Sequence, residues 1–250
     1  MLKTERYASI LFKILQCEIC GHAFLSPKPK QNSVMPLYSN PKLNERARAT
    51  EEQAFEYYEN LLRHYVNRHF AATGRKRVLD LGCGLGTFLA CAEKSGYEGY
   101  GIDINEASVE YAKGKHGVRA VVGSFYELEK HFERNSFDLL WMHHVLEHVF
   151  DPVKFIPYVS DFIRLQGLIV IGVPNIDSDD FATNGACWSY LQIPAHINYW
   201  NRMSMDILML QKMRKRGLFF ELLFHESFPP PGKREGEGFV SAYRLRVRMR

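Results

Sequence analysis

Short apolar runs alternate with segments of helical periodicity between residues 77 and 173. The apolar runs are rich in Val, Ile and Leu, a composition typical of buried strands. Because helical segments separate consecutive runs, we expect a doubly wound α/β fold, with a mostly parallel sheet and helices on both faces. The predicted strands are Arg77–Leu81, Gly99–Ile102, Arg119–Val122, Phe137–Met142 and Leu168–Val173.

The C-terminal part of the sequence predicts one more helix and two more strands. Residues 175–187 are polar and are expected to form a loop. Ser204 is a candidate N-cap for a helix that runs through Met213 and stops at Gly217. Two further strands, near Phe219–His225 and Phe239–Val247 with a hairpin-like link at Pro229–Gly232, bring the expected sheet to seven strands.

The first seventy residues differ in pattern from the rest of the chain. Residues 1–42 are rich in Pro and Lys, and we expect them to be irregular. From Asn44 to Phe70, apolar residues recur every three or four positions, which predicts one long amphipathic helix. We therefore expect a helical N-terminal extension over residues 1–70 and the α/β domain over residues 71–250. The predicted apolar face of the helix is Phe55, Tyr58, Leu61, Leu62, Tyr65, Val66 and Phe70.

Composition narrows the class of protein. The chain has 250 residues, of which 46% are hydrophobic, enough for one sizeable core. Its net charge of +4 does not by itself indicate a nucleic-acid partner. The five cysteines have no dense spacing pattern, which favours a reducing compartment. No apolar stretch reaches the length of a membrane span, so we expect a cytoplasmic protein with no membrane partner; the sequence indicates no oligomeric state.

A glycine-rich turn after the first predicted strand carries the clearest functional signal. Gly82, Gly84 and Gly86 can adopt positive φ and leave no Cβ between the backbone and a ligand. The helix expected at Thr87–Lys94 would present free N–H groups at its start. Asp80, just before the glycines, would repel a phosphate but can bind a cationic or hydroxyl-bearing ligand.

A second acid, Asp103, follows the strand expected at Gly99–Ile102. It lies about twenty residues beyond the turn, where a βαβ unit places a carboxylate on ribose hydroxyls. This order of strands, acids and glycines resembles the class I S-adenosylmethionine-dependent methyltransferases, whose first strand reads V-L-D-[LIV]-G-x-G-x-G. The resemblance implies a Rossmann-like sheet with an antiparallel last strand, S-adenosylmethionine as cofactor and S-adenosylhomocysteine as product. The glycine-rich turn of a nicotinamide oxidoreductase would have the spacing G-x-G-x-x-G instead.

The resemblance also indicates which residues bind the cofactor. The acid that usually follows the third strand and meets the adenine amino group is missing, but Ser124 can hydrogen-bond there and Phe125 can stack on a purine. The backbone around Met142 and His143 is expected beside the methionine part. The expected cofactor-binding residues are Asp80, Gly82, Cys83, Gly84, Asp103, Ile104, Ser124, Phe125 and His143.

The segment Ser136–Pro152 resembles the ubiquinone-type O-methyltransferases and their small-molecule relatives, which implies a small-molecule acceptor. His144, Glu147 and His148 within it have the i, i+3, i+4 spacing of one helical face. That spacing also matches the inverted zincin motif. A divalent metal on these side chains is a further alternative, weakened because His144 replaces the glutamate of many relatives. We expect Glu147 and His148 to bind backbone groups at a helix start, and we expect no metal.

Three histidines are candidate catalytic residues. The segment Pro194–Trp200 corresponds to the one that covers the acceptor pocket in the relatives, which makes His196 a candidate base. Because imidazole exchanges protons near neutral pH, His144, His148 and His196 are the expected catalytic residues, with His144 nearest to the strand end.

Two other readings of the function remain open. A cofactor-binding partner protein without catalysis is one alternative. An RNA-directed methyltransferase is the other, since arginines alternate with apolar residues at the C-terminus. A strand with one charged face explains those arginines without a nucleic acid: Arg244, Arg246, Arg248 and Arg250.

The cysteines near the N-terminus resemble part of a metal site. Cys17, Cys20 and His22 are similar to the second half of a zinc knuckle found ahead of some small-molecule methyltransferases. A structural zinc site takes four ligands, and the first cysteine pair of the knuckle is absent from this chain. We therefore expect no tightly bound zinc at this segment.

Overall fold

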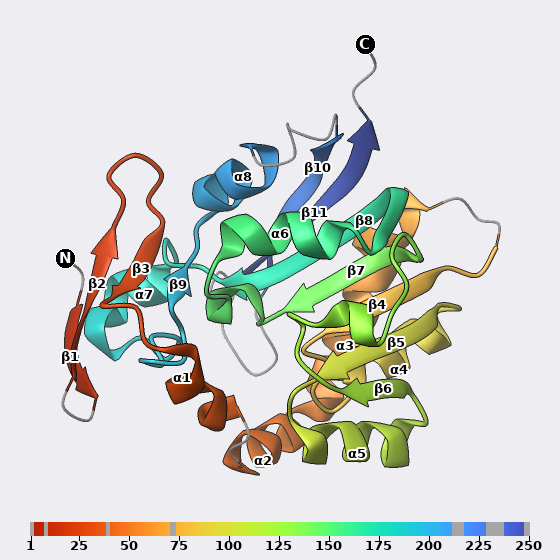
Figure 1. The fold of residues 1–250 in the computed structure, drawn as a ribbon, viewed down its shortest axis with the longest axis horizontal. Coiled ribbons are helices and arrows are strands. Elements are labelled where there is room, and N and C mark those ends of the chain that lie inside the picture. Colours follow the sequence, from red (N-terminus) through yellow and green to blue (C-terminus); the bar gives the residue numbers. More distant parts are fainter. Residues whose placement is uncertain are drawn as a thin grey trace.

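The computed structural model describes residues 3–7, 10–38, 41–70, 74–211, 218–228 and 238–247. Its central feature is a seven-stranded sheet with the strand order β10-β11-β8-β7-β4-β5-β6 (Figure 1). The strands from β4 to β8 pair in parallel, whereas β11 runs antiparallel to both β8 and β10. This confirms the doubly wound fold and its antiparallel end. The strands are β4 (Arg77–Leu81), β5 (Glu98–Asp103), β6 (Arg119–Val122), β7 (Phe137–His143), β8 (Ile163–Pro174), β10 (Leu218–Phe228) and β11 (Gly238–Val247).

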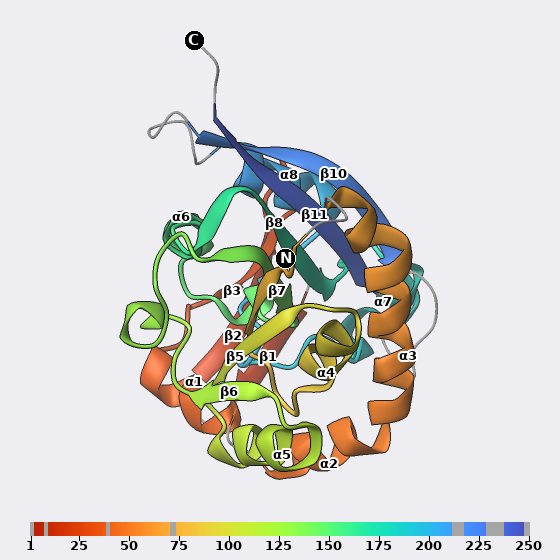
Figure 2. The same ribbon diagram turned by 90° about the vertical axis from the view of Figure 1, so that its right-hand side faces the viewer.

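Helices cover both faces of this sheet (Figures 1 and 2). Along β7, Leu139 and Trp141 pack in the same cluster as α3 (Glu51–Leu61), α4 (Thr87–Lys94) and α5 (Glu106–His116). The alternate residues Leu140 and Met142 pack with α6 (Pro152–Ser160) and α8 (Arg202–Gln211). Because side chains of a strand alternate between faces, burial on both sides explains why the central strands read as continuous apolar runs.

The N-terminal residues form a second sheet, so the expectation that residues 1–42 are irregular is wrong. Strands β1 (Lys3–Tyr7), β2 (Ile10–Gln16) and β3 (Ala23–Ser26) pair antiparallel, and β3 also pairs with β9 (Asn198–Tyr199). In β2, the buried Phe12 and Ile14 alternate with exposed residues, and they pack with Trp188 and Tyr199. Most of the buried residues that pack against this sheet come from residues 176–199.

The long helix expected from Asn44 to Phe70 is broken. The structure has α1 (Gln31–Tyr38), α2 (Pro41–Ala49) and α3, with Thr50 outside helical geometry at φ −113° and ψ 12°. A π-helical turn, η1 (Leu62–Val66), and a 3-10 turn, η2 (Asn67–His69), follow. The buried face was nevertheless predicted, since Leu61, Leu62 and Val66 are buried against the sheet. The division of the chain at residue 70 stays a prediction.

Two local expectations need adjustment in the C-terminal part. Helix α8 begins after Asn201, whose Oδ1 accepts from the Ser204 N–H while Ser204 Oγ accepts from the Asn201 N–H. Asn201 is therefore the N-cap and Ser204 sits one turn inside. The polar loop 175–187 contains the short helix α7 (Asp179–Asn184) and a 3-10 turn, η5 (Gly185–Cys187). The predicted helix end at 212–217, the link at 229–232, Arg248 and Arg250 lie outside the described residues.

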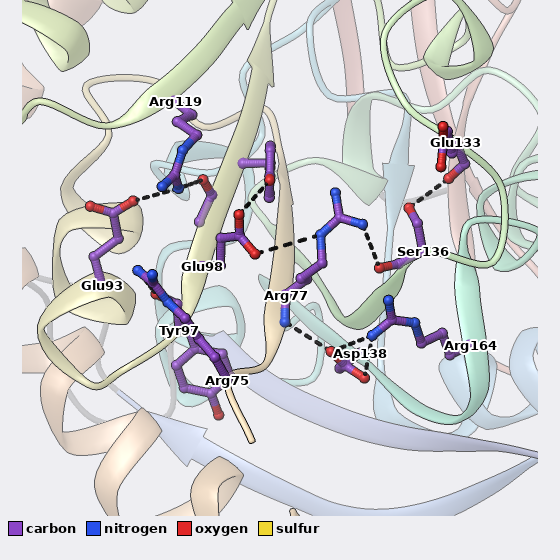
Figure 3. Close-up of polar contacts among 12 residues, drawn as sticks. Arg75, Arg77, Glu93, Tyr97, Glu98, Arg119, Glu133, Ser136, Asp138 and Arg164 are labelled. Carbon is purple, nitrogen blue, oxygen red and sulfur yellow. Dashed lines mark hydrogen bonds and ion pairs between the residues drawn. The ribbon is translucent and has the colours of Figure 1, made fainter. Parts of the chain in front are cut away.

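Charged groups tie the strand beginnings together at one edge of the sheet (Figure 3). Asp138 of β7 accepts from the Arg77 N–H at 2.8 Å and from the Arg164 guanidinium at 3.1 Å. The Arg77 guanidinium donates to the Ser136 carbonyl and lies 3.9 Å from Glu98. The opposite edge, where the strands end, is left for the glycine turn. Within the described residues, no helix is long and apolar enough to cross a membrane.

Candidate cofactor and acceptor site

The glycine turn between β4 and α4 crosses over the end of β5. The N–H groups of Gly82 and Cys83 donate to the Ile102 carbonyl at 2.8 and 3.1 Å. All three turn glycines have positive φ: 69° at Gly82, 51° at Gly84 and 76° at Gly86. The predicted positive φ is confirmed at each of them.

The turn glycines differ in what surrounds them. A Cβ added at Gly84 would meet no atom within 4 Å, so this residue faces open space. A Cβ at Gly86 would lie 2.7 Å from the Cβ of Ala112, so Gly86 permits the close approach of α5 to the turn. A Cβ at Gly82 would lie 2.9 Å from Val145. Of the three, Gly84 is the one that leaves room for a ligand.

Asp103 is held rigidly beside this open space. One carboxylate oxygen accepts from the Gly84 N–H at 2.8 Å, and the other accepts from the Asn105 N–H at 2.8 Å. Burial raises the pKa of Asp103, and these backbone hydrogen bonds oppose that rise. The carboxylate therefore has a defined position at the carboxyl end of β5, where α/β sheets bind their ligands.

Two cavities flank the turn. The first, of about 260 Å³, lies on the side of β5 and β6, and the second, of about 320 Å³, on the side of β4 and β7. The aromatic rings of the second cavity are Tyr58, Phe88, Trp141 and Tyr190. Both cavities are lined by Gly82, Gly84, Leu85 and His144, so they adjoin one another across the turn. Together they form one elongated binding space.

The residues expected to bind the cofactor all line this space. Six of them line the first cavity: Gly82, Gly84, Asp103, Ile104, Ser124 and Phe125. Five line the second, with two shared: Asp80, Gly82, Cys83, Gly84 and His143. Burial and the nearby Asp103 raise the pKa of Asp80 well above its usual range. A cationic ligand group beside Asp80 would favour its ionised form.

The N-terminal helices form one wall of the site, which sequence reasoning missed. Met35 and Tyr38 of α1 and Asn44 and Ala47 of α2 line the first cavity. Asn105 Nδ2 donates to the Tyr38 carbonyl at 3.0 Å, and Ser108 Oγ donates to Asn44 Oδ1 at 2.8 Å. These bonds join the wall to the N-cap and the first turn of α5, directly after Asp103.

A weak sequence signal for this wall does exist. Ala47, Thr50 and Ala54 recur at three and four residues, and all three line the second cavity. Because these side chains are small, they leave room between the helices and the strand ends, and this room is part of the binding space.

His143 ends β7 as a neutral, fully engaged side chain. Its ring nitrogens lie 3.1 Å from the Tyr57 hydroxyl and 3.5 Å from the Tyr58 hydroxyl. Burial is the largest cause that lowers the pKa of His143 well below its usual range. This histidine therefore borders the second cavity without being available for proton transfer.

His144 lies where the two cavities adjoin. Its backbone is left-handed, with φ 57°, and its ring stacks on Tyr190 with the ring centroids 5.8 Å apart. Its Nδ1 lies 3.0 Å from Oε1 of Glu147. The expected helical face 144–148 is not formed, because His144 is left-handed and only η4 (Leu146–His148) is helical, as a 3-10 turn.

Glu147 is a buried anion. Its side chain is 1% exposed, and burial opposes ionisation, but the hydrogen bond from His144 and the surrounding histidines lower its pKa to about 2. Its Oε2 has no hydrogen-bond partner in the described part of the chain. The expectation that Glu147 binds backbone groups is wrong, since its side-chain partner is an imidazole.

The two remaining candidate bases lie in different environments. His148 lines the first cavity, and its Nδ1 lies 2.9 Å from the Ala195 carbonyl, a backbone group 47 positions away and not one at the helix start as expected. His196 lines neither cavity and is 3% exposed, edge-on to His148 with ring centroids 4.7 Å apart. Burial and His148 lower the pKa of His196 to about 3. The structure therefore does not bring His196 to the binding space.

The segment Pro194–Trp200 lines neither cavity, and its expected role as a cover of the acceptor pocket stays a prediction. It contributes β9 to the N-terminal sheet, and Ile197 N–H donates to the Glu147 carbonyl at 2.9 Å. Tyr199 and Trp200 are buried. Both aromatic residues therefore pack in the interior of the protein.

Possible metal ligands gather differently from the sequence spacing. Among the described residues, Glu147, His148 and His196 have ligand atoms within 4.8 Å of one another, whereas His144 contacts Glu147 but is not part of this group. Cys17 and Cys20 are free thiols in the β2–β3 turn, which Cys17 N–H closes by donating to the His22 carbonyl at 2.8 Å. The absence of metal at both places stays a prediction.

Known proteins that are similar to this chain show which family it belongs to. Residues 54–212 match a family model described as a methyltransferase domain. The ubiquinone biosynthesis O-methyltransferase of Hahella chejuensis is 37% identical over 139 residues, 53% of this chain and 58% of the relative. That of Neisseria meningitidis serogroup C is 25% identical over 162 residues, 62% of this chain and 68% of the relative. With the relative from Bradyrhizobium diazoefficiens, the match spans 55% of the relative's length.

Solved structures show the same fold. A SAM-dependent methyltransferase from Archaeoglobus fulgidus has a TM-score of 0.55 at 19% identity, with 76% of this chain and 94% of that chain covered. Phosphoethanolamine N-methyltransferase 1 of Haemonchus contortus, in complex with phosphoethanolamine and S-adenosylhomocysteine, has a TM-score of 0.65 at 14% identity. That alignment covers 87% of this chain and 49% of the other.

Proposed function

Since this chain belongs to the family of S-adenosylmethionine-dependent methyltransferases, we propose that it transfers the cofactor's methyl group to a small-molecule acceptor. The relatives that match it over 51–70% of their length are named as O-methyltransferases of ubiquinone biosynthesis, which supports an acceptor of this kind. The five free thiols support the cytoplasm as its compartment.

The residues of the binding space fit the cofactor. The open space over Gly84 leaves room for a ligand close to the backbone, and the pinned carboxylate of Asp103 suits ribose hydroxyls. Phe125 offers an apolar face to adenine at the end of the first cavity. In the second cavity, Asp80 suits an ammonium group, and the Trp141 indole N–H, buried without a partner in the described residues, suits a carboxylate. When bound there, the cofactor supplies an electrophilic methyl group on a sulfonium.

The lining also restricts the acceptor. Among the residues that the structure describes, those that line the two cavities include two acids, Asp80 and Asp103, and no Lys or Arg. An acceptor with a phosphate or carboxylate would lose its hydration there without gaining a counter-charge. Aromatic rings on one side of His144 instead suit a flat, uncharged or cationic molecule. We therefore assign the acceptor to the part of the second cavity next to His144 and Tyr190, and the methionine end of the cofactor to the part next to Asp80 and Trp141.

The observation that carries the proposal is the open space over Gly84 beside the fixed carboxylate of Asp103. Titration calorimetry of the wild-type chain with S-adenosylhomocysteine tests the cofactor assignment. Asp103→Asn should weaken binding, while Asp179→Asn, at an exposed acid on α7, should not. Equal affinities in the three proteins would contradict the assignment.

The acceptor class needs a separate measurement. Cofactor labelled in its methyl group is incubated with the chain and a cell extract that has been divided into small molecules, RNA and protein. Label in the small-molecule fraction supports the proposal. Label in RNA or protein would overturn the acceptor class, and cofactor binding without any transfer would favour a non-catalytic partner protein.

A further inference from the structure

The backbone of His144 is bent out of the strand direction at the end of β7. Its φ of 57° lies in the left-handed region, which a histidine adopts only where its surroundings enforce it. The His144 N–H still donates to the Gly172 carbonyl at 2.9 Å, so the residue remains attached to β8. The bend brings the imidazole to the place where both cavities are lined by the same residues.

The imidazole is fixed there from two sides. Tyr190 stacks on the ring with an interplanar angle of 10°, and Glu147 binds Nδ1 from the protein interior. Within the described residues, His144 is the one side chain that hydrogen-bonds to the Glu147 carboxylate. A buried carboxylate with a single imidazole partner acts on that partner with little screening by water.

This contact determines which nitrogen of the ring carries the proton. An ionised carboxylate can only accept hydrogen bonds, so Nδ1 of His144 must be the donor. A neutral imidazole with a proton on Nδ1 has its lone pair on Nε2. Because the His144 side chain is 33% exposed and its Nδ1 is engaged in the interior, Nε2 is the nitrogen left for the binding space.

The neighbouring histidines lack this arrangement. Both nitrogens of His143 lie within hydrogen-bond distance of tyrosine hydroxyls. His148 uses Nδ1 on the Ala195 carbonyl and lines only the first cavity, and His196 lines neither. The ionisable groups around His144 are thus His143, Glu147, His148, Tyr190 and His196, and Glu147 is the anion among them.

We propose that Glu147 is the positioning residue for a base at His144, which removes the proton of the acceptor during methyl transfer. This rests on the proposed function. The acceptor's O–H or N–H proton passes to Nε2 as the bond from that oxygen or nitrogen to the methyl carbon forms and the bond from the sulfonium sulfur to the methyl carbon breaks. The products are the methylated acceptor, S-adenosylhomocysteine and an imidazolium that Glu147 stabilises. The imidazolium then releases its proton to water through its exposed side.

The tautomer of His144 can be measured without an acceptor. Two-bond proton–nitrogen correlation spectra of protein labelled with ¹⁵N-histidine, assigned with His144→Gln, report which ring nitrogen is protonated. The expected result at high pH is a proton on Nδ1 of His144. A proton on Nε2 in the wild-type chain would overturn the proposal, whatever the behaviour of any variant.

The reactivity of Nε2 gives a second readout. Diethyl pyrocarbonate acylates unprotonated imidazole nitrogens, and peptide mass spectrometry follows His144 with the exposed His64 as internal reference. Glu147→Gln keeps the shape of the side chain but removes its charge, which makes Nε2 less nucleophilic, so at high pH His144 should react about threefold or more slowly relative to His64. Glu127→Gln, at an exposed glutamate paired with Lys130, is the matched control and should change nothing.

Binding of S-adenosylhomocysteine distinguishes a failure of the proposed function from a failure of the role of Glu147. Calorimetry showing no binding by the wild-type chain would refute the proposed function. Binding with unchanged His144 reactivity in Glu147→Gln would refute only the role of Glu147. If His144 of Glu147→Gln reacts more slowly than His144 of the wild-type chain only after treatment with a chelator, the carboxylate binds a metal, and the proposal is also overturned.

Discussion

Asp103 accepts a hydrogen bond from the backbone N–H of Gly84 at 2.8 Å, so the carboxylate at the end of β5 and the open turn after β4 are fixed to each other. The two residues are 19 positions apart in sequence. Neither alone defines a binding site. Together they set a carboxylate beside a stretch of backbone that a ligand can approach without meeting a side chain.

Asp103→Ala is therefore expected to weaken the binding of S-adenosylhomocysteine by about 1–3 kcal/mol, the scale of lost hydrogen bonds to a charged group. Because burial raises the pKa of Asp103, the affinity of the wild-type chain should also fall as the pH drops through that raised value. Calorimetry at several pH values checks both points. Unchanged affinity in the variant would show that another group holds the ribose.

Gly84 and Gly86 form a matched pair for testing the turn. Both have positive φ, so replacement by Ala strains the backbone similarly at each. At Gly84 the new Cβ enters the binding space, and Gly84→Val should abolish cofactor binding while the chain still folds. At Gly86 it meets Ala112 at 2.7 Å, so Gly86→Ala should lower the melting temperature more than Gly84→Ala does. Thermal melts with and without S-adenosylhomocysteine decide this. Stabilisation of Gly84→Val by the ligand would contradict a binding role.

Much of the main sheet could be predicted because its signals are local. The bounds of β4, β6 and α4 agree with the expectation to the residue, since a buried apolar run between glycines and charged residues leaves few alternatives. The positive φ of the turn glycines was predictable for the same reason. The positions of Asp80, Asp103 and His143 at strand ends follow from the alternation of strands and helices.

The errors at the N-terminal sheet and at the site concern contacts between distant parts of the chain. Strand β3 pairs with β9, which lies more than 170 positions later in the sequence, so no window of residues 1–42 contains its partner. His196 has an ordinary sequence context, and its burial results from packing between the N-terminal sheet and η4. The wall formed by α1 and α2 depends on side chains such as Asn105 and Ser108 reaching back to them.

Buried neutral histidines should make the fold sensitive to acid. Burial is the largest cause that lowers the pKa of His22 to about 4 and that of His196 to about 3. The unfolded chain takes up protons at these groups from about pH 6.5 downward, so the free energy of unfolding should fall between pH 6.5 and 4. Each such group contributes up to about 1.4 kcal/mol per pH unit. Urea titrations of the wild-type chain and His196→Gln measure the slope, and the variant should have the smaller one. The same slope in both would exclude His196 as its source.

The Cys17–Cys20 turn is expected to hold no tightly bound zinc. Two thiols and one nearby imidazole leave a tetrahedral site short of a ligand, and His22 is packed against Trp200 with ring centroids 4.3 Å apart. Elemental analysis of protein purified without chelator checks this. One zinc per chain that is lost in Cys17→Ser would show that further ligands exist, for example from a second copy of the chain.

The different positions of the histidines predict different consequences of their removal. His144 lines both cavities, stacks on Tyr190 and is the hydrogen-bond partner of the buried Glu147, so His144→Ala should lower the melting temperature but leave the cofactor affinity of the folded protein near the wild-type value. With an acceptor from the labelled-methyl experiment, the turnover of His144→Ala should fall about 10²–10⁴-fold, the range for loss of a base.

His196→Ala removes a buried ring that packs on His148, so it should lower the melting temperature and leave the turnover of the folded fraction unchanged. Rates per folded molecule, obtained by titrating the cofactor-binding sites in each preparation, separate these effects. If His144→Ala keeps the wild-type rate, methyl transfer proceeds by positioning of the acceptor alone, because His143 is engaged by two tyrosine hydroxyls and His148 lines only the first cavity.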